Sequence, residues 1–154
     1  MKKLLNSVAL VLLTLVLSLS LVACSSYGKV EKALNNIGYT LINSSDKADD
    51  MEKESDVAVT MHIFSNADSL SLLEAGKLNT VIVMEFKQTE DMKKFYQDSD
   101  TMQGFIKDVK EDGSAEDFYN TLVEKGYANG NCLVISITLS SESAQAVRNA
   151  VRNA

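Results

Sequence analysis

An uncharged apolar run near the N-terminus separates the start of this 154-residue chain from the rest. Lys2 and Lys3 precede the run, and the residues from Leu4 to Val22 carry no charge. A positive segment followed by an apolar one is the pattern of a signal peptide, because the positive end stays inside while the apolar part enters the membrane. A permanent transmembrane helix is the alternative, since roughly 17 to 25 apolar residues can span a bilayer. Under either interpretation, the folded domain has to come from the residues that follow.

The run ends in Leu21, Val22, Ala23 and Cys24. These four residues resemble the lipobox of bacterial lipoproteins, which is Leu, a small or aliphatic residue, Ala or Gly, and then Cys. The resemblance implies cleavage after Ala23, a covalent diacylglyceryl group on the Cys24 sulfur, and often a further acyl chain on the new amino group. Two or more acyl chains anchor a protein stably, whereas a single chain binds membranes only marginally and reversibly.

The same resemblance implies an organisation and a location. Residues 1–23 would be the lipoprotein signal peptide, and residues 24–26 the lipidated cysteine with a short tether. The domain would then lie close to the extracytoplasmic face of the cell membrane. In a cell with two membranes, Ser25 in place of Asp after the lipidated cysteine favours the outer one.

The charge balance narrows the set of partners. Against 15 Lys and Arg stand 21 Asp and Glu, for a net charge of -6, and cleavage would also remove Lys2 and Lys3. Nucleic acids and anionic lipid surfaces both attract basic faces, so we expect neither to be bound through charge. With Cys24 lipidated, Cys132 would have no partner for a disulfide within the chain.

Residues 27–154 are predicted to form a single α+β domain, because this length suits one domain and helical and strand periodicities both occur. The sheet is expected to be antiparallel or mixed with about four strands, and the helices to lie on one of its faces. A ferredoxin-like two-layer sandwich is one arrangement that this order allows. The expected strands are residues 39–42, 57–64, 80–86 (the central strand) and 132–139, and the expected helices are 28–37, 65–77, 89–97, 102–109, 114–125 and 141–151.

Four local signals are more specific. The Thr89 hydroxyl is expected to cap the helix that starts there, and Ser140 and Ser141 are expected to open the last helix. Asn129 and Gly130 predict a turn. Alternation then predicts that Leu139 shares one face of the last strand with Leu133, Ile135 and Ile137.

Residues 43–56 are predicted to be a solvated acidic loop, because almost nothing in them is apolar. Their acidic side chains could bind cations loosely, but they are interleaved with Lys47 and Lys53, which is typical of a solvated segment. Loops that start at Asp98 and Asp108 lack the ligand positions of a calcium-binding loop. We therefore expect neither a metal site nor a cofactor other than the lipid. The acidic residues are Asp46, Asp49, Asp50, Glu52, Glu54 and Asp56.

Four side chains are candidates for chemistry or ligand binding. His62, the only histidine in the chain, has no evident partner in the sequence and is expected to be a surface or half-buried strand residue. Cys132 could be a nucleophile with His62 as its base, although its apolar setting suits a buried small hydrophobe better. Arg148 and Arg152 lie four apart on one helical face and could grip a phosphate or carboxylate. Their interaction with the helix dipole is the simpler interpretation.

No motif in the chain indicates catalysis. The leading hypothesis is therefore a lipid-anchored binding or interaction module of the bacterial cell envelope, and not an enzyme. Its partner would be another envelope protein, a wall polymer or a small ligand. The alternative is a small envelope hydrolase whose residues converge only in the fold, which predicts His62 or Cys132 in a cleft with carboxylates nearby.

Overall fold

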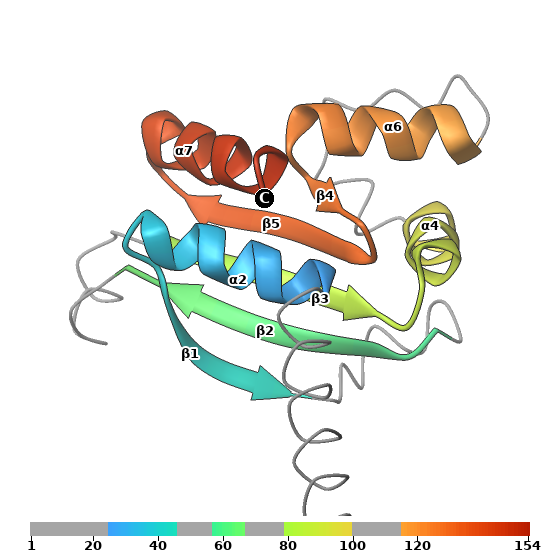
Figure 1. Ribbon diagram of the computed structural model, residues 1–154, viewed down its shortest axis with the longest axis horizontal. Coiled ribbons are helices and arrows are strands. Elements are labelled where there is room, and N and C mark those ends of the chain that lie inside the picture. The colour runs from blue at the N-terminus through green and yellow to red at the C-terminus, as the bar shows by residue number, and fades with distance from the viewer. Residues whose placement is uncertain (1–24, 46–56, 67–78, 100–114) are drawn as a thin grey trace, which may run out of the picture.

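The computed structural model describes residues 25–45, 57–66, 79–99 and 115–154. The strands in these ranges are β1 (Thr40–Ser45), β2 (Val59–Ser65), β3 (Asn79–Phe86), β4 (Ala128–Asn129) and β5 (Cys132–Thr138). The helices are α2 (Ser26–Asn36), α4 (Thr89–Asp98), α6 (Ala115–Lys125) and α7 (Ser141–Arg152). The predicted α+β class is confirmed (Figure 1).

The five described strands form one sheet in the order β1-β2-β3-β5-β4, with every pair of neighbours antiparallel. The prediction of about four strands omitted β4, whose two residues pair with β5. A ferredoxin-like sheet is built from split βαβ units. The described part of the chain contains one split βαβ unit, in which β5 lies between β3 and β4. On the other side of β3, β1 and β2 are direct neighbours with no strand between them. The sheet order is therefore not ferredoxin-like, and β3 is central as predicted.

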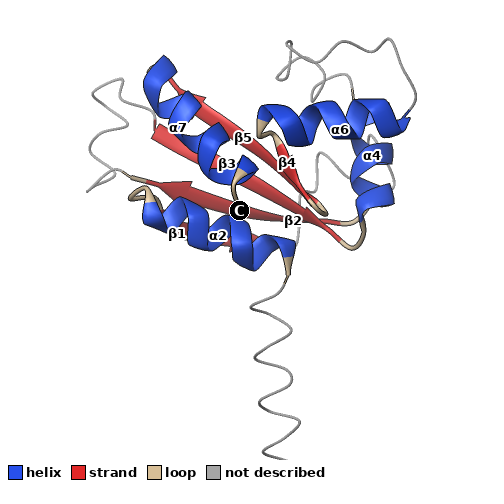
Figure 2. Ribbon diagram, turned by 45° about the horizontal axis from the view of Figure 1, so that its top comes forward, coloured by secondary structure: helices blue, strands red, loops and turns tan. Residues whose placement is uncertain are grey.

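Apolar clusters cover both faces of the sheet. The α2/α7 cluster joins those two helices to one face (Figure 2). The α4/α6 cluster joins the other two described helices to the opposite face. In β2, Phe64 belongs to the first cluster and Val59 to the second. The expectation of helices on one face is therefore wrong for the described helices, because β2 lies inside the sheet and both of its faces are covered. The α2/α7 cluster contains Val30, Leu34, Tyr39, Phe64, Val81, Val83, Cys132, Val134, Val147 and Val151. The α4/α6 cluster contains Val57, Val59, Met84, Phe86, Met92, Phe95, Tyr96, Phe118, Leu122, Ala128, Leu133 and Ile135.

Local signals place several helix ends. The Ser25 hydroxyl accepts a hydrogen bond from the Gly28 N–H at 3.0 Å, and α2 is followed by Gly38 with φ of +87°. The predicted start of the last helix is confirmed, since α7 begins at Ser141 and the Ser140 hydroxyl caps it by accepting from the Ser143 N–H at 3.2 Å. These bonds satisfy amides that have no partner within the helix.

Other local predictions need correction. Thr89 is the first residue of α4 and not its cap. The cap position holds Gln88, whose side chain accepts no hydrogen bond from the helix amides and instead donates to Asp91 at 3.3 Å. The loop predicted at 43–56 begins later, since residues 43–45 belong to β1. Leu139, expected to share a face of the strand with Leu133, Ile135 and Ile137, lies after the end of β5 and is 80% exposed. Residues 46–56, most of the helix predicted at 65–77, and the helix predicted at 102–109 lie outside the described residues.

Candidate functional site

A row of polar side chains crosses the face of the sheet that α2 and α7 cover. Ser44 of β1 is the direct neighbour of His62 of β2, and Glu85 of β3 is paired with Thr60, two residues before His62. Because residues two apart on a strand share a face, Ser44, His62 and Glu85 meet on the same side of the sheet. Ser44 Oγ lies 2.8 Å from His62 Nδ1, and Glu85 Oε2 lies 3.2 Å from His62 Nε2. We call these three residues the polar row.

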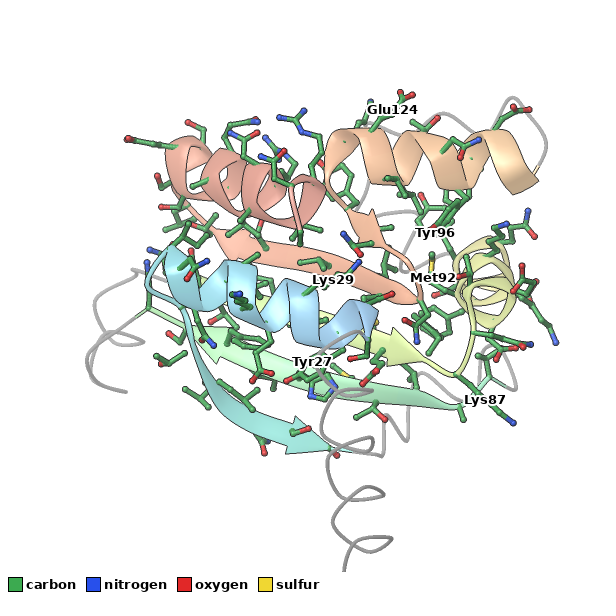
Figure 3. The ribbon with its side chains drawn as sticks, viewed as in Figure 1. Tyr27, Lys29, Lys87, Met92, Tyr96 and Glu124 are labelled. Carbon is green, nitrogen blue, oxygen red and sulfur yellow. The ribbon has the colours of Figure 1, made fainter. Side chains whose placement is uncertain are left out.

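His62 is buried within this row, with 6% of its surface exposed. The ring of Tyr27, a residue of the first turn of α2 that is labelled in Figure 3, stacks on the imidazole with centroids 3.8 Å apart and planes inclined by 22°. The expectation of a surface or half-buried histidine is therefore wrong, and the sequence alone did not reveal the partners of the ring. Both ring nitrogens have one, and the partners lie 18 and 23 residues away in sequence.

The bond to Glu85 determines which nitrogen of His62 carries hydrogen in the neutral ring. An ionised carboxylate can only accept hydrogen bonds, so Nε2 is the donor to Glu85. In the neutral ring Nδ1 is then unprotonated and accepts the hydrogen bond that the Ser44 hydroxyl donates. The row thus places a base against a hydroxyl group, and a carboxylate against the base.

Tyr27 stays neutral above this row. Burial raises the pKa of Tyr27 to about 12, and the charges of Glu31 and Glu85 act in the same direction. The phenol therefore keeps its proton at neutral pH. It presents an uncharged aromatic face to His62.

Cys132 lies opposite Glu85 in the β3–β5 pairing and is fully buried. Burial raises the pKa of the Cys132 thiol to about 12, and the charge of Glu85 adds to this effect. Since the thiolate is the nucleophilic form, the thiol is poorly suited to attack a substrate at neutral pH. These surroundings fit the interpretation of Cys132 as a buried small hydrophobe.

A cavity of about 450 Å³ adjoins the row at Glu85. The Glu85 side chain is 29% exposed and reaches both the cavity and His62. Lys87, which Figure 3 shows beyond the end of β3, places a positive charge on the same lining. The cavity therefore combines two opposite charges with apolar surface. Its lining residues are Ala58, Val59, Thr60, Glu85, Phe86, Lys87 and Asn131.

The β4–β5 turn lies against the first turn of α2. Gly130, in that turn, has φ of +56°, and a Cβ atom there would overlap Ser26 Oγ. The N-terminal end of α2 is therefore packed against the sheet beside Tyr27. The turn itself was predicted from Asn129 and Gly130, and it contains Gly130 and Asn131 between the paired Asn129 and Cys132.

The other predicted site residues lie apart from this row. Arg148 donates to Gln145 at 2.8 Å, and Arg152 donates to Asn149 at 2.7 Å, so both bond to amide side chains of α7 itself. A phosphate or carboxylate bound by the two arginines stays a prediction. Ala23 and Cys24 lie outside the described residues, and their processing also stays a prediction.

Among residues 25–45, 57–66, 79–99 and 115–154, no helix is long and apolar enough to cross a membrane. Within the same ranges, no three His, Cys, Asp or Glu side chains are grouped so that they could hold a metal ion. No protein-family model matches the chain, and no similar protein was found among curated proteins or solved structures.

Proposed function

We propose that the protein is a bacterial lipoprotein, anchored through Cys24 at the extracytoplasmic face of the cell envelope, whose domain binds a ligand or partner beside the anchor. One observation supports placing the binding site there. Tyr27, which stacks on His62 of the polar row, follows Cys24 by only three positions.

The covalent chain limits how far the polar row can lie from the lipid. Each residue spans at most about 3.6 Å, so the Cα atoms of Cys24 and Tyr27 are at most about 11 Å apart. The polar headgroup layer of one leaflet is about 5 to 7 Å thick. A domain anchored at Cys24 therefore carries its polar row and the adjoining cavity next to the membrane surface.

The cavity indicates the chemistry of the ligand. Glu85 and Lys87 place opposite charges on its lining, which also includes apolar surface. Such a lining complements a small molecule, or the end of a polymer or peptide, that carries both a positive and a negative group. It does not complement a polyanion, and the net charge of -6 opposes one as well.

The anchor is tested by intact mass spectrometry of protein extracted from membranes. Wild type is expected to have a mass that begins at Cys24 and includes diacylglyceryl. Cys24→Ala is expected to lose both the cleavage and the lipid. Cys132→Ala, which changes the other cysteine, is the matched control and should be processed like wild type. A wild-type chain without lipid would contradict the proposal.

The binding site is tested by a photo-crosslinking amino acid placed at Lys87 and, as a control, at the exposed Leu139. Lys87 lies at one end of the sheet, beside the cavity, whereas Leu139 follows β5 at the opposite end. Irradiation of intact cells is expected to give a specific adduct from position 87 and not from position 139. Equal yields at the two positions would argue against a binding site at the cavity.

A further inference from the structure

We propose that Ser44, His62 and Glu85 form a serine-dependent esterase site, in which Ser44 is the nucleophile, His62 the general base and Glu85 the residue that positions the imidazole. This inference goes beyond the proposed binding function. It also names specific residues for the hydrolase alternative. Neither Ser44 nor Glu85 was a candidate from the sequence alone.

The distances fit the chemistry. A nucleophile and its base act within about 2.6 to 3.2 Å of each other, and the base is in turn oriented by a third group. Here these separations are 2.8 Å from Ser44 to His62 and 3.2 Å from His62 to Glu85. The three residues stand on adjacent strands of one hydrogen-bonded sheet, so the strand pairing holds them in place.

Exposure differs along the row in the way a nucleophilic site needs. Ser44 lies on the edge strand β1 and is exposed to solvent, so a substrate can reach its hydroxyl. His62 is 6% exposed, which shields the base from water. In the well-known serine triad the serine contacts Nε2 and the acid contacts Nδ1. In this protein the two nitrogens of His62 exchange these roles: Glu85 contacts Nε2, and Nδ1 accepts the hydrogen bond from Ser44.

Tyr27 provides an independent observation in favour of this assignment. During attack His62 becomes a cation, and a cation over an aromatic face is stabilised. The centroid of the Tyr27 ring lies 3.8 Å from that of the imidazole, and the Glu85 carboxylate is hydrogen-bonded to Nε2 of His62. Burial raises the pKa of Tyr27 to about 12, so the ring remains a neutral phenol in this role.

The reaction balances without any further reagent except water. Ser44 Oγ attacks the carbonyl carbon of an ester while its proton moves to His62 Nδ1. The C–O bond to the alcohol breaks, and the alcohol leaves with that proton, so the acyl group stays on Ser44. Water then attacks this acyl-serine and gives a proton to Nδ1, and the proton returns to Ser44 as the acid is released. The substrate class is esters carried by membrane-bound amphiphiles, and this choice rests on the proposed lipid anchor. The reactivity of Ser44 itself does not depend on the anchor.

The test uses a fluorophosphonate probe on the full-length protein in detergent. Attack by Ser44 breaks the P–F bond, forms a P–O bond and passes the proton to His62. Peptide mapping is expected to find the label on Ser44. Ser44→Ala should lose it, and Ser45→Ala, which changes the neighbouring serine of β1, should react like wild type. His62→Gln should slow labelling by roughly 10²- to 10⁴-fold, the usual contribution of a general base.

Two further readouts distinguish a catalytic row from a purely structural one. Glu85→Gln should shift the pH profile of the labelling rate, because the residue acts through His62, and a urea midpoint close to that of wild type excludes simple unfolding. Ser44 should react with the probe in wild type and in Cys24→Ala alike. The labelling of Ser44 can therefore be interpreted even if Cys24 proves not to be lipidated. A folded wild type that is not labelled at Ser44, or labelling at full rate in a folded His62→Gln, would overturn the proposal.

Discussion

Gly126→Ala is expected to lower the free energy of unfolding by about 3 to 5 kcal/mol, whereas Gly38→Ala should lower it by only about 1 to 2 kcal/mol. Both glycines have left-handed backbone conformations, with φ of +76° at Gly126 and +87° at Gly38. An alanine pays the same conformational cost at either position, because its Cβ is crowded against the main chain in that region. Backbone strain therefore contributes equally to the two variants and cancels when they are compared.

The difference between the two variants comes from what the new methyl group would meet. At Gly38 nothing lies within 4 Å of the position that a Cβ atom would take, while at Gly126 the Cβ would overlap the main-chain carbonyl of Arg148. That carbonyl belongs to α7, which is packed on the sheet through the buried Val147 and Val151. Relief of the overlap requires α7 to shift from this packing. Urea unfolding followed by circular dichroism measures both variants, and equal losses would show that α7 does not pack closely against Gly126.

Phe95→Ala should destabilise the fold by about 3 to 5 kcal/mol, the range for removal of a fully buried aromatic side chain. Phe95 is 0% exposed, and its ring centroid lies 5.1 Å from that of Phe86 in β3. The substitution would leave a cavity between α4 and the sheet. It tests the α4/α6 cluster, which covers the face of the sheet opposite α2 and α7.

Leu139→Ala is the matched control for this substitution, because the Leu139 side chain is 80% exposed. It should change the free energy of unfolding by no more than about 0.5 kcal/mol, as is usual for surface substitutions. Both variants are compared by their urea midpoints and slopes. A loss at Phe95 no larger than that at Leu139 would mean that α4 does not pack on the sheet as described.

Local signals in the sequence were enough to predict several elements. The hydroxyl of Ser140 and the spacing of Val147 and Val151 indicate α7, because a cap and a helical face involve residues only three or four positions apart. The apolar run of β3 indicates its central place in the sheet. The cap of α4 was placed one residue late, at Thr89, because adjacent polar residues compete for that role.

Alternation along β2 identifies the residues that share a face, but not the elements that cover each face. Val59 and Phe64 are both buried, on opposite sides, under helices that come from distant parts of the chain. The prediction of one covered face failed for this reason. Periodicity is a property of a single strand, whereas coverage depends on the path of the chain between strands.

The sequence by itself determined that His62 stands on a strand, that Cys132 begins another, and that Leu21 to Cys24 resemble a lipobox. Only the tertiary structure decided what His62 contacts. Its partners Ser44 and Glu85 come from the two neighbouring strands, and a shift of either strand by one residue would turn those side chains to the other face. Register is set by pairing between distant segments, and a period of two along one strand does not specify it.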